Sequence, residues 1–396
     1  MRVALLHDYL NQYGGAERVL ESFCEIFPDA PIYTLFYDEE KTLGKFKGKK
    51  IITSFLNNKF VCDHHRLFIP LMPVAASLMK INNDYDMVLS SSAGFGKGIK
   101  TGQAIHVSYC HTPLRYAWEH YKYFNWGTTL KMISAPAFWY LKMWDKIAGR
   151  KTHKLIANSK YISEKIKNYY EKESDIIYPP VDTETFFIHS GIKKIKDLGE
   201  SLLKKYPTSS ILQNNFKDLN DKNIQSSKRG NYFVAVGRLV HYKKFDLIIQ
   251  TFNKLNLPLL VIGEGPELSK LKKVARSPKI EFLEFISDEH LNFIYNYAQA
   301  LIFPQIEDFG LVAAEAQACG TPVVALNQGG GKEIVVDGKT GILFNHQNTE
   351  DLIMAVRKIQ IREFDQKLIR KYAMRFSKNK FKKDILKAVY GARDGS

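Results

Sequence analysis

Short apolar segments, each followed by a loop and then by residues with helical spacing, are the feature that most constrains how this chain folds. The first segment is Val3–Leu6, and Gly14 and Gly15 lie in the loop after it. Between residues 19 and 26 the apolar side chains recur every three or four positions, which indicates a helix. A segment this short that is apolar throughout is typical of a strand buried on both faces of a parallel sheet. Strand, glycine loop and helix in this order predict the opening of a doubly wound α/β domain.

The same alternation recurs along the chain in two series. In the first series, further strands are predicted over 87–89, 104–109 and 154–158. The second series predicts strands over 232–237, 259–263, 300–304 and 321–326 and helices over 245–253, 266–275, 288–298 and 312–319. We therefore predict two facing Rossmann-like units, over 1–185 and 186–375, the second with a polar insertion near 187–230 that contains one helix over 197–205. Because ligands of such sheets bind at the carboxyl ends of the strands, the cleft between the units is the expected site.

The composition excludes several classes of protein. Hydrophobic residues make up 45% and charged residues 25% of the 396 residues, an ordinary balance for a globular protein with a large core. The four cysteines are far apart, which indicates neither a disulfide scaffold nor a metal-binding pair. No segment has the length and apolarity of a signal peptide or a transmembrane helix, and we expect a cytoplasmic protein. The net charge of +16 favours a phosphorylated or polyanionic ligand. A nucleic-acid-binding protein is the competing class, although the basic residues are dispersed and no nucleic-acid-binding module is visible.

The strongest chemical signal is the segment 306–315, which follows a predicted strand. Gly310 opens the next predicted helix, so the amides of Phe309, Gly310 and Leu311 lie where a helix start leaves N–H groups unpaired and can bind an anion. Glu307 precedes this helix and Glu315 lies in its second turn, and both carboxylates can accept hydrogen bonds from sugar hydroxyls. A helix with an acidic start and a solvated glutamate is the alternative, and the spacing alone leaves both open.

The second signal is the basic loop that begins at Gly237, directly after a predicted strand. Arg238 and Lys243 project from the carboxyl end of that strand, where a guanidinium fork and an ammonium group can bind phosphate oxygens. Together they could stabilise the negative charge of a departing diphosphate. A solvated basic turn is the alternative, and the position after a strand favours the functional interpretation.

Two glycine runs and one histidine complete the candidates. Gly14–Gly15 and Gly329–Gly331 each follow a strand and would permit close approach of phosphate or sugar, but neither matches a known phosphate-binding motif, and a tight turn is the favoured interpretation of either alone. His111 ends a strand and can direct a hydrogen bond into the cleft, although a lone histidine is more often structural. The other histidines do not have metal-ligand spacing.

Taken in order, these segments resemble glycosyltransferase family 4, the retaining enzymes of the two-Rossmann architecture called GT-B. The resemblance spans nearly the whole chain, and it implies that the last segment, 376–396, is a helix that crosses back to the first domain. The matching segments are Gly14–Glu17, His111–Pro113, Ala157–Ser159, Pro180–Asp182, Gly237–Leu239 with Lys243, Gly263–Gly265, Glu307 with Glu315, Ala318–Val323 and Gly338–Gly341.

The resemblance implies a role for each matching residue around a nucleotide diphosphate sugar. Arg238 and Lys243 would hold the diphosphate, and Gly14 and Gly15 would let the N-terminal loop approach it. Glu307 would face the donor sugar. The amides of Phe309, Gly310 and Leu311 would also bind the sugar, and His111 would contact it near the reacting carbon. Glu315 would accept hydrogen bonds from the ribose hydroxyls, and the base would pack near Phe285 and Ile286. Glu284 stands where the family often has glycine, so the base pocket of this chain differs from the usual one.

The implied reaction is transfer of a sugar to a hydroxyl with retention. It needs no metal ion or other cofactor, because arginine and lysine replace the cation. The catalytic set is His111, Arg238, Lys243 and Glu307, without a separate base, since the leaving diphosphate is thought to accept the proton.

The segment 111–118 is similar to bacterial mannosyltransferases that build O-antigen and related surface polysaccharides. This implies GDP-mannose as donor and a glycan or a polyprenyl-diphosphate-linked saccharide as acceptor. A UDP-sugar-dependent enzyme of the same family, and a GT-B epimerase or phosphorylase, are the alternatives. The segments 55–60 and 68–72 offer aromatic residues mixed with lysine, which suit weak contact with an anionic membrane. A location at the inner face of the cell membrane is therefore left open. For a third aromatic segment, 138–144, a core helix is the favoured interpretation.

Overall fold

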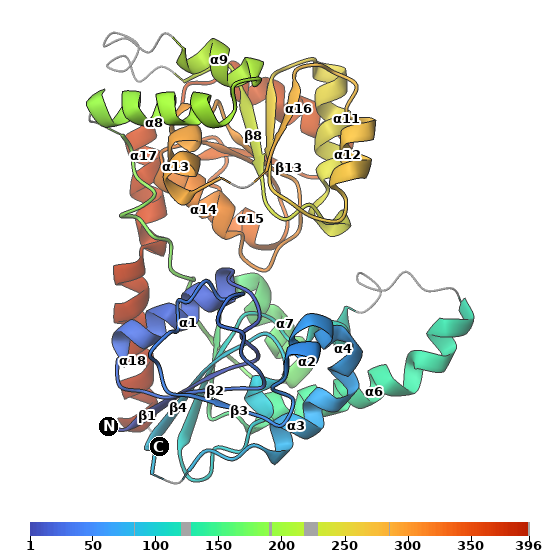
Figure 1. Ribbon diagram of the computed structural model, residues 1–396, viewed down its shortest axis with the longest axis vertical. Coiled ribbons are helices and arrows are strands. Elements are labelled where there is room, and N and C mark those ends of the chain that lie inside the picture. The colour runs from blue at the N-terminus through green and yellow to red at the C-terminus, as the bar shows by residue number, and fades with distance from the viewer. Residues whose placement is uncertain (83, 120–127, 190–191, 218–228, 285, 395–396) are drawn as a thin grey trace. The chain divides into compact units, whose positions relative to one another are not determined.

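The computed structural model describes residues 1–82, 84–119, 128–189, 192–217, 229–284 and 286–394. The chain divides into two compact units, of which the first comprises Met1–Pro180 with Lys378–Ser396 and the second comprises Val181–Ser377. These limits lie close to the boundaries at 185/186 and 375/376 expected from the sequence. Each unit is built around a parallel sheet with helices packed on it (Figure 1).

The first unit contains a seven-stranded sheet in the order β3-β2-β1-β4-β5-β6-β7, in which every neighbouring pair is parallel. The chain runs outward from β1 through β2 to β3 and then returns to the other side of β1 with β4, so the strand order reverses between β1 and β4. Its strands are β1 Val3–His7, β2 Ile32–Thr34, β3 Ile51–Thr53, β4 Met87–Ser92, β5 Ile105–Cys110, β6 Lys154–Ala157 and β7 Asp175–Ile176. Its helices, with 3₁₀ turns marked η, are α1 Gly15–Ile26, α2 Lys59–His64, η1 His65–Leu71, α3 Met72–Leu78, η2 Gly96–Gly98, α4 Arg115–Trp118, α6 Thr128–Lys151, α7 Lys160–Tyr170 and α18 Lys378–Asp394.

The last helix, α18, belongs to the first unit although it ends the chain. It contacts α1 and β5, and its apolar face enters the core of that unit through Phe381, Ile385 and Val389. Lys378 and Lys382 both pair with Glu25 of α1. The last helix therefore packs on the first unit through its apolar face, as the resemblance implied.

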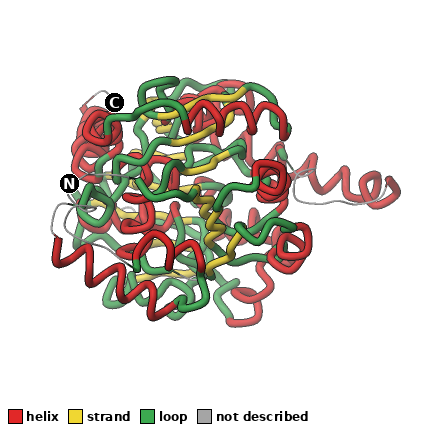
Figure 2. The backbone as a smooth tube through the Cα atoms, turned by 90° about the horizontal axis from the view of Figure 1, so that it is seen from above, coloured by secondary structure: helices red, strands yellow, loops and turns green. Residues whose placement is uncertain are grey.

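Helix α6 extends away from the sheet of the first unit in both views (Figures 1 and 2). It is anchored by Asp145, whose carboxylate accepts hydrogen bonds from the indole of Trp118 and the hydroxyl of Tyr170, both at 2.8 Å. Lys97 lies 2.7 Å from the same carboxylate, and both side chains are fully buried. The interpretation of 138–144 as a core helix is wrong in part, because Leu141 is buried but Trp139 is 67% exposed.

The second unit contains a six-stranded parallel sheet in the order β10-β9-β8-β11-β12-β13, which reverses between β8 and β11. This is the strand order of a dinucleotide-binding Rossmann domain. Its strands are β8 Phe233–Val236, β9 Leu259–Ile262, β10 Ile280–Leu283, β11 Leu301–Phe303, β12 Val323–Leu326 and β13 Gly341–Phe344. Its helices are α8 Ile192–Lys205, α9 Ser210–Phe216, η3 His241–Lys243, α11 Phe245–Leu255, α12 Leu268–Val274, α13 Asp288–Tyr297, α14 Leu311–Ala318, α15 Gly329–Ile334, α16 Thr349–Gln360, α17 Gln366–Ala373 and η4 Met374–Phe376.

The polar segment near 187–230 is an integral part of the second unit where the structure describes it. It contains two helices, α8 and α9, where the sequence predicted one, and α8 contacts α13. The side chains of Asn292 and Asn296 on α13 accept hydrogen bonds from the backbone N–H groups of Phe187 and His189 at 3.3 and 3.0 Å. Buried apolar side chains attach the two helices as well, Ile195 and Leu202 on α8 and Ile211, Leu212 and Phe216 on α9. Residues 190–191 and 218–228 of this segment lie outside the described residues.

Candidate functional site

The basic loop and the acidic loop of the second unit lie at the point where the strand order of its sheet reverses. The basic loop follows β8 and the acidic loop follows β11, and these two strands are neighbours. In open α/β sheets, ligands bind outside the carboxyl ends of the strands at this reversal. The fold therefore brings the two strongest sequence signals to one edge of one sheet.

Lys243 and Glu307 form an ion pair across this reversal. The Nζ of Lys243 lies 3.0 Å from Oε1 of Glu307, and their side chains are 17% and 20% exposed. The amide of Gln305, which is buried, donates to the same carboxylate oxygen at 3.3 Å. A lysine and a glutamate that both retain access to solvent can exchange this contact for contacts to a bound anion and to a bound hydroxyl.

Close packing of two glycine loops fixes the start of the basic loop. Gly237 and Gly263 end the neighbouring strands β8 and β9, and the N–H of Gly237 donates to the carbonyl of Ile262 at 3.0 Å. A Cβ on Gly263, whose φ is +142°, would lie 2.0 Å from the carbonyl oxygen of Gly237. Only glycine fits there, so the loop that leads to Lys243 is held against its neighbour.

Arg238 lies in the same loop but points to solvent. Its side chain is exposed, and no hydrogen bond or ion pair joins its guanidinium to a residue that the structure describes. The sequence placed Arg238 beside Lys243 as a phosphate ligand, and the structure leaves its fork of donors open to a ligand.

The acidic loop is shaped by the glycine run at the start of α15. The N–H of Gly330 donates to the carbonyl of Glu307 at 2.8 Å, and a Cβ on Gly330 would lie 2.0 Å from the carbonyl oxygen of Phe309. These glycines therefore pack against the protein's own backbone, in agreement with the structural interpretation of the run. Phe309 is buried and its ring meets that of Phe376 edge to face at 5.2 Å.

The start of α14 provides two unpaired backbone donors. Gly310 is the N-cap with φ +105°, and neither its N–H nor that of Leu311 donates to any described residue. Unpaired N–H groups at the positive end of a helix dipole bind anions and hydroxyl oxygens. Glu315 lies one turn further along and is 5% exposed, with alanines beside it at 313, 314 and 316.

The residues expected near the base are only partly described. Ile286 is buried at the start of the loop before α13, and Ser287 caps that helix. Phe285 lies outside the described residues. Glu284 is exposed, and its carboxylate lies 4.0 Å from Nζ of Lys272.

In the first unit, His111 lies near the reversal between β1 and β4. Its Nε2 lies 2.8 Å from the hydroxyl of Ser91, the last residue but one of β4. Ser91 in turn lies 3.2 Å from Nδ1 of His7, and Nε2 of His7 lies 3.5 Å from the carboxylate of Glu17. The sequence analysis assigned His111 to the site but missed His7 and Ser91. The signal was present, because polar residues 90–92 interrupt an otherwise apolar strand.

Gly14 and Gly15 form the start of α1 beside this chain of side chains. The N–H of Gly14 donates to the carboxylate of Glu17 at 2.8 Å, which is the one half of a capping box that a glycine N-cap allows. Burial raises the pKa of the Glu17 carboxyl, but its hydrogen bond and electrostatic interaction with His7, and its hydrogen bonds with the backbone, lower the pKa further, so that it lies below its usual value. Glu17 is therefore an ionised, buried acceptor.

Asp8 is a second buried carboxylate at the end of β1 that the sequence analysis did not use. It accepts hydrogen bonds from the hydroxyl of Ser92 and from the N–H groups of Ala93 and Gly96, at 2.8, 2.6 and 2.6 Å. These three bonds hold the loop after β4 in place.

Among the residues that the structure describes, no helix is both long and apolar enough to cross a bilayer. Within the same residues, no group of three or more histidine, cysteine, aspartate and glutamate side chains is arranged to hold a metal ion.

Comparison with protein families finds a similarity that includes most of the second unit. The family model of glycosyl transferases group 1 matches residues 216–383. This stretch is similar to the group 1 glycosyl transferases. The matched stretch contains both Lys243 and Glu307, the loops that carry them and the strands β8 and β11.

Curated relatives match part of the chain. An uncharacterized glycosyltransferase of Methanocaldococcus jannaschii is 29% identical over 167 residues, which cover 41% of this chain and 47% of the relative. The D-inositol 3-phosphate glycosyltransferase of Mycobacteroides abscessus is 35% identical over 140 residues, 32% of this chain and 31% of the relative. The matched region thus spans less than half the length of these curated relatives.

Solved structures match the whole chain in fold. HepE of Anabaena, solved in complex with UDP-glucose, has a TM-score of 0.68 at 17% identity, covering 99% of this chain and 100% of HepE. WaaG, a glycosyltransferase involved in lipopolysaccharide biosynthesis, has a TM-score of 0.61 at 14% identity over 94% of each chain. With its two parallel-sheet α/β units and these neighbours, the chain has the GT-B fold that the sequence predicted.

Proposed function

We propose that the protein is a glycosyltransferase that moves a sugar from a nucleotide diphosphate sugar to a hydroxyl group. The observation that carries this proposal is the ion pair of Lys243 and Glu307 beside the unpaired N–H groups of Gly310 and Leu311. A cation suits the diphosphate, and a carboxylate with adjacent backbone donors suits the hydroxyls of a sugar. The matching family model supports the same chemistry.

In this proposal Lys243 and Arg238 stabilise the charge that grows on the diphosphate as the bond to the sugar breaks. They supply the positive charge, so the proposed reaction uses no metal ion or other cofactor. Glu307 and the amides of Phe309, Gly310 and Leu311 hold the sugar. Glu315 accepts hydrogen bonds from the ribose, Ile286 lies beside the base, and His111 and the loop at Gly14 and Gly15 serve the donor from the first unit.

The finer assignment is a retaining member of glycosyltransferase family 4 with a hexose donor. The segment 111–118 supports GDP-mannose and a glycan or polyprenyl-diphosphate-linked acceptor in surface-polysaccharide synthesis, and the likeness to WaaG is in keeping with such a pathway. The complex of HepE with UDP-glucose favours a second candidate, a UDP-sugar donor.

A donor screen tests the proposal. The purified protein is incubated with GDP-, UDP- and ADP-sugars, with and without saccharide acceptors, and nucleotide diphosphate release is measured. We expect turnover with one donor class and a loss of about 100-fold in Lys243→Met, the scale of removing one group that stabilises transition-state charge. Lys273→Met, which removes an exposed lysine of α12, is the matched control and should keep full activity. Failure of every donor, or full activity of Lys243→Met, would refute the proposal.

We further propose that the first unit binds an anionic membrane at the inner face of the cell membrane through an apolar surface. This surface consists of the exposed side chains of Phe55, Phe60, Leu67, Leu71, Val74 and Leu78. Leu67 is 70% exposed and Leu78 is 65% exposed. The exposed cations Lys59, Arg66 and Lys80 lie among them. Apolar side chains with interspersed cations suit the interface of an anionic bilayer.

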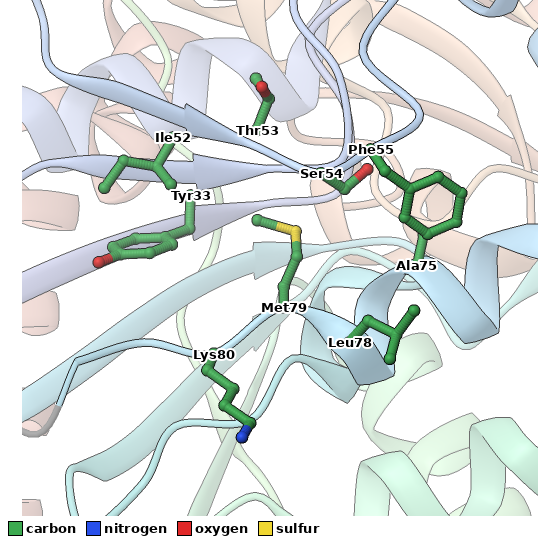
Figure 3. A pocket seen from close by; sticks show the side chains of 9 residues that line it. All are labelled: Tyr33, Ile52, Thr53, Ser54, Phe55, Ala75, Leu78, Met79 and Lys80. Carbon is green, nitrogen blue, oxygen red and sulfur yellow. The ribbon is translucent and has the colours of Figure 1, made fainter.

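A hollow of 290 Å³ adjoins this surface between the β2–β3 edge of the sheet and α3. In Figure 3, Phe55 and Leu78 lie on one side of the hollow and Tyr33 and Ile52 on the other, with Met79 between them. Space of this size beside exposed apolar residues gives an inserted acyl chain a place to pack.

Vesicle sedimentation tests the membrane contact. We expect binding to vesicles that contain anionic lipid at low salt, and loss of binding when Phe60, Leu67 and Leu78 are all replaced by serine. Replacement of Met354 and Ile361, which are 54% and 88% exposed on the second unit, is the control and should leave binding unchanged. Equal binding by both variants would contradict the assignment.

A further inference from the structure

Four polar side chains from four parts of the first unit form a continuous chain that ends at His111. Glu17 comes from α1, His7 from the end of β1, Ser91 from the end of β4, and His111 from the residue after β5. Glu17, His7 and Ser91 are buried and His111 is half-buried. The chain begins in the protein interior and ends at the carboxyl edge of the sheet, where ligands of such sheets bind.

The ionised state of Glu17 gives this chain a direction. With the ring of His7 neutral, its proton lies on Nε2, the nitrogen that faces Glu17 at 3.5 Å, because a carboxylate can only accept hydrogen bonds. Nδ1 of His7 is then an acceptor and receives the hydroxyl proton of Ser91 across 3.2 Å. The oxygen of Ser91 in turn accepts from Nε2 of His111 at 2.8 Å.

One competing arrangement is available to the serine. The hydroxyl of Ser91 can instead donate to the carbonyl of Ala16, but that distance is 3.4 Å, longer than either bond to the histidines. The shorter contacts favour the arrangement in which Ser91 relays the orientation of His7 to His111.

We propose that Glu17, His7 and Ser91 are positioning residues that hold the ring of His111 and keep its proton on Nε2, so that Nδ1 accepts a hydrogen bond from a sugar hydroxyl. This inference rests on the proposed function for its substrate and deepens it by assigning a tautomer to His111. Outer partners that fix the tautomer and orientation of a histidine are a general means of preparing its other nitrogen for a ligand.

A purely structural cluster would use the same four residues, so the test needs a readout beyond stability. The ¹⁵N chemical shifts of labelled histidine report directly which ring nitrogen carries the proton. The protein has 11 histidines, and a His111→Gln variant assigns the signals of His111.

Ser91→Ala and Ser90→Ala make a matched pair for this experiment. Ser90 is the preceding residue of β4, and its hydroxyl lies 2.9 Å from Nε2 of a different histidine, His106. Ser90→Ala removes one buried serine–histidine hydrogen bond from this strand, whereas Ser91→Ala removes two, to His7 and to His111, and interrupts the chain.

We expect His111 to be protonated on Nε2 in the wild type and in Ser90→Ala, and to become a mixture of tautomers in Ser91→Ala. We also expect kcat to fall about tenfold in Ser91→Ala with little change in KM, and Ser91→Thr, which keeps the hydroxyl, to restore both signals. An unchanged His111 tautomer in Ser91→Ala, or an Nδ1-protonated ring in the wild type, would overturn the inference. If no donor is turned over, the proposed function fails on its own, because the tautomer measurement needs no activity.

Discussion

Nζ of Lys243 and Oε1 of Glu307 lie 3.0 Å apart and link the loops after β8 and β11, the two strands between which the order of the second sheet reverses. The two charges neutralise each other without ligand. A bound diphosphate would have to draw Lys243 from Glu307, and a bound sugar would have to replace the ammonium group as the partner of the carboxylate. The ion pair therefore competes with the contact of Lys243 to the diphosphate and with the contact of Glu307 to the sugar.

This competition predicts opposite effects of Glu307→Gln on binding and on turnover. Loss of the carboxylate removes the ion pair with Lys243 and a negative charge near the diphosphate, so the affinity for a free nucleotide diphosphate should rise about fivefold, equivalent to about 1 kcal/mol. Turnover should fall, because the sugar loses a charged acceptor. Calorimetry and the transfer assay measure the two effects. Glu350→Gln, which breaks an exposed pair with Lys254 at 3.1 Å, should change neither.

Glu315→Gln should weaken nucleotide binding in a way that depends on the ribose. Hydrogen bonds to a buried carboxylate contribute about 1.5–3 kcal/mol each, so we expect an affinity loss of roughly 10- to 100-fold. The wild type should bind the 2′,3′-dideoxy nucleotide more weakly than the parent nucleotide, and the variant should bind both alike. Glu289→Gln, at an exposed glutamate of α13, is the control. If Glu315→Gln still distinguishes the two nucleotides, its assignment to the ribose is wrong.

Gly330→Ala should disrupt the acidic loop. The added methyl group would lie 2.0 Å from the carbonyl oxygen of Phe309, so the backbone that carries Glu307 must move. We expect a destabilisation of about 1–3 kcal/mol and loss of nucleotide binding, measured by thermal unfolding and calorimetry. Gly391→Ala, in a helix with nothing within 4 Å of the new methyl group, should be neutral or slightly stabilising. Normal binding by Gly330→Ala would show that this contact does not shape the loop.

His106 should make the protein sensitive to mild acid. Burial, followed by the charges of His153, Lys172 and Lys97, lowers its pKa from 6.5 to about 3. Between these values the unfolded chain binds one more proton than the folded chain, so the free energy of unfolding falls as pH falls. The loss should be about 2 kcal/mol between pH 6.5 and pH 5.

Denaturant unfolding at pH 7 and pH 5 checks this expectation, since carboxyl groups titrate mainly below that range. His106→Gln should flatten the pH dependence even if it lowers stability at pH 7, where the bond to Ser90 is lost. His64→Gln, at an exposed histidine, should keep the wild-type slope. A slope in His106→Gln equal to that of the wild type would assign the acid sensitivity to other groups.

Much of the fold could be predicted from the sequence because its central strands are continuous apolar segments. β8 and β12 consist of apolar residues throughout, and β1 is apolar up to its last residue, His7. The edge strand β3 and its neighbour β2 have three residues each, too few to show a pattern. Helix α9 was harder to predict, because it is short and its attachment to the second unit depends in part on hydrogen bonds to Glu281.

The site was predictable where it lies within one loop and not where it depends on pairing between distant residues. Lys243 and Glu307 were each identified from local context, but nothing local indicates that they form an ion pair. Likewise, His7 and Ser91 are 84 residues apart and become neighbours only because β1 pairs with β4 in register, with His7 opposite Ser91.

The account depends most on positive charge at the end of β8 binding the diphosphate of a sugar donor. The direct test is calorimetric titration of the wild type and of Arg238→Met/Lys243→Met with a nucleotide diphosphate sugar and with the corresponding nucleoside. We predict one site per chain in the wild type, and in the double variant a loss of about 100-fold in affinity for the sugar nucleotide with little change for the nucleoside. Equal affinity of both proteins for the sugar nucleotide, or no binding of any sugar nucleotide by the wild type, would contradict the account.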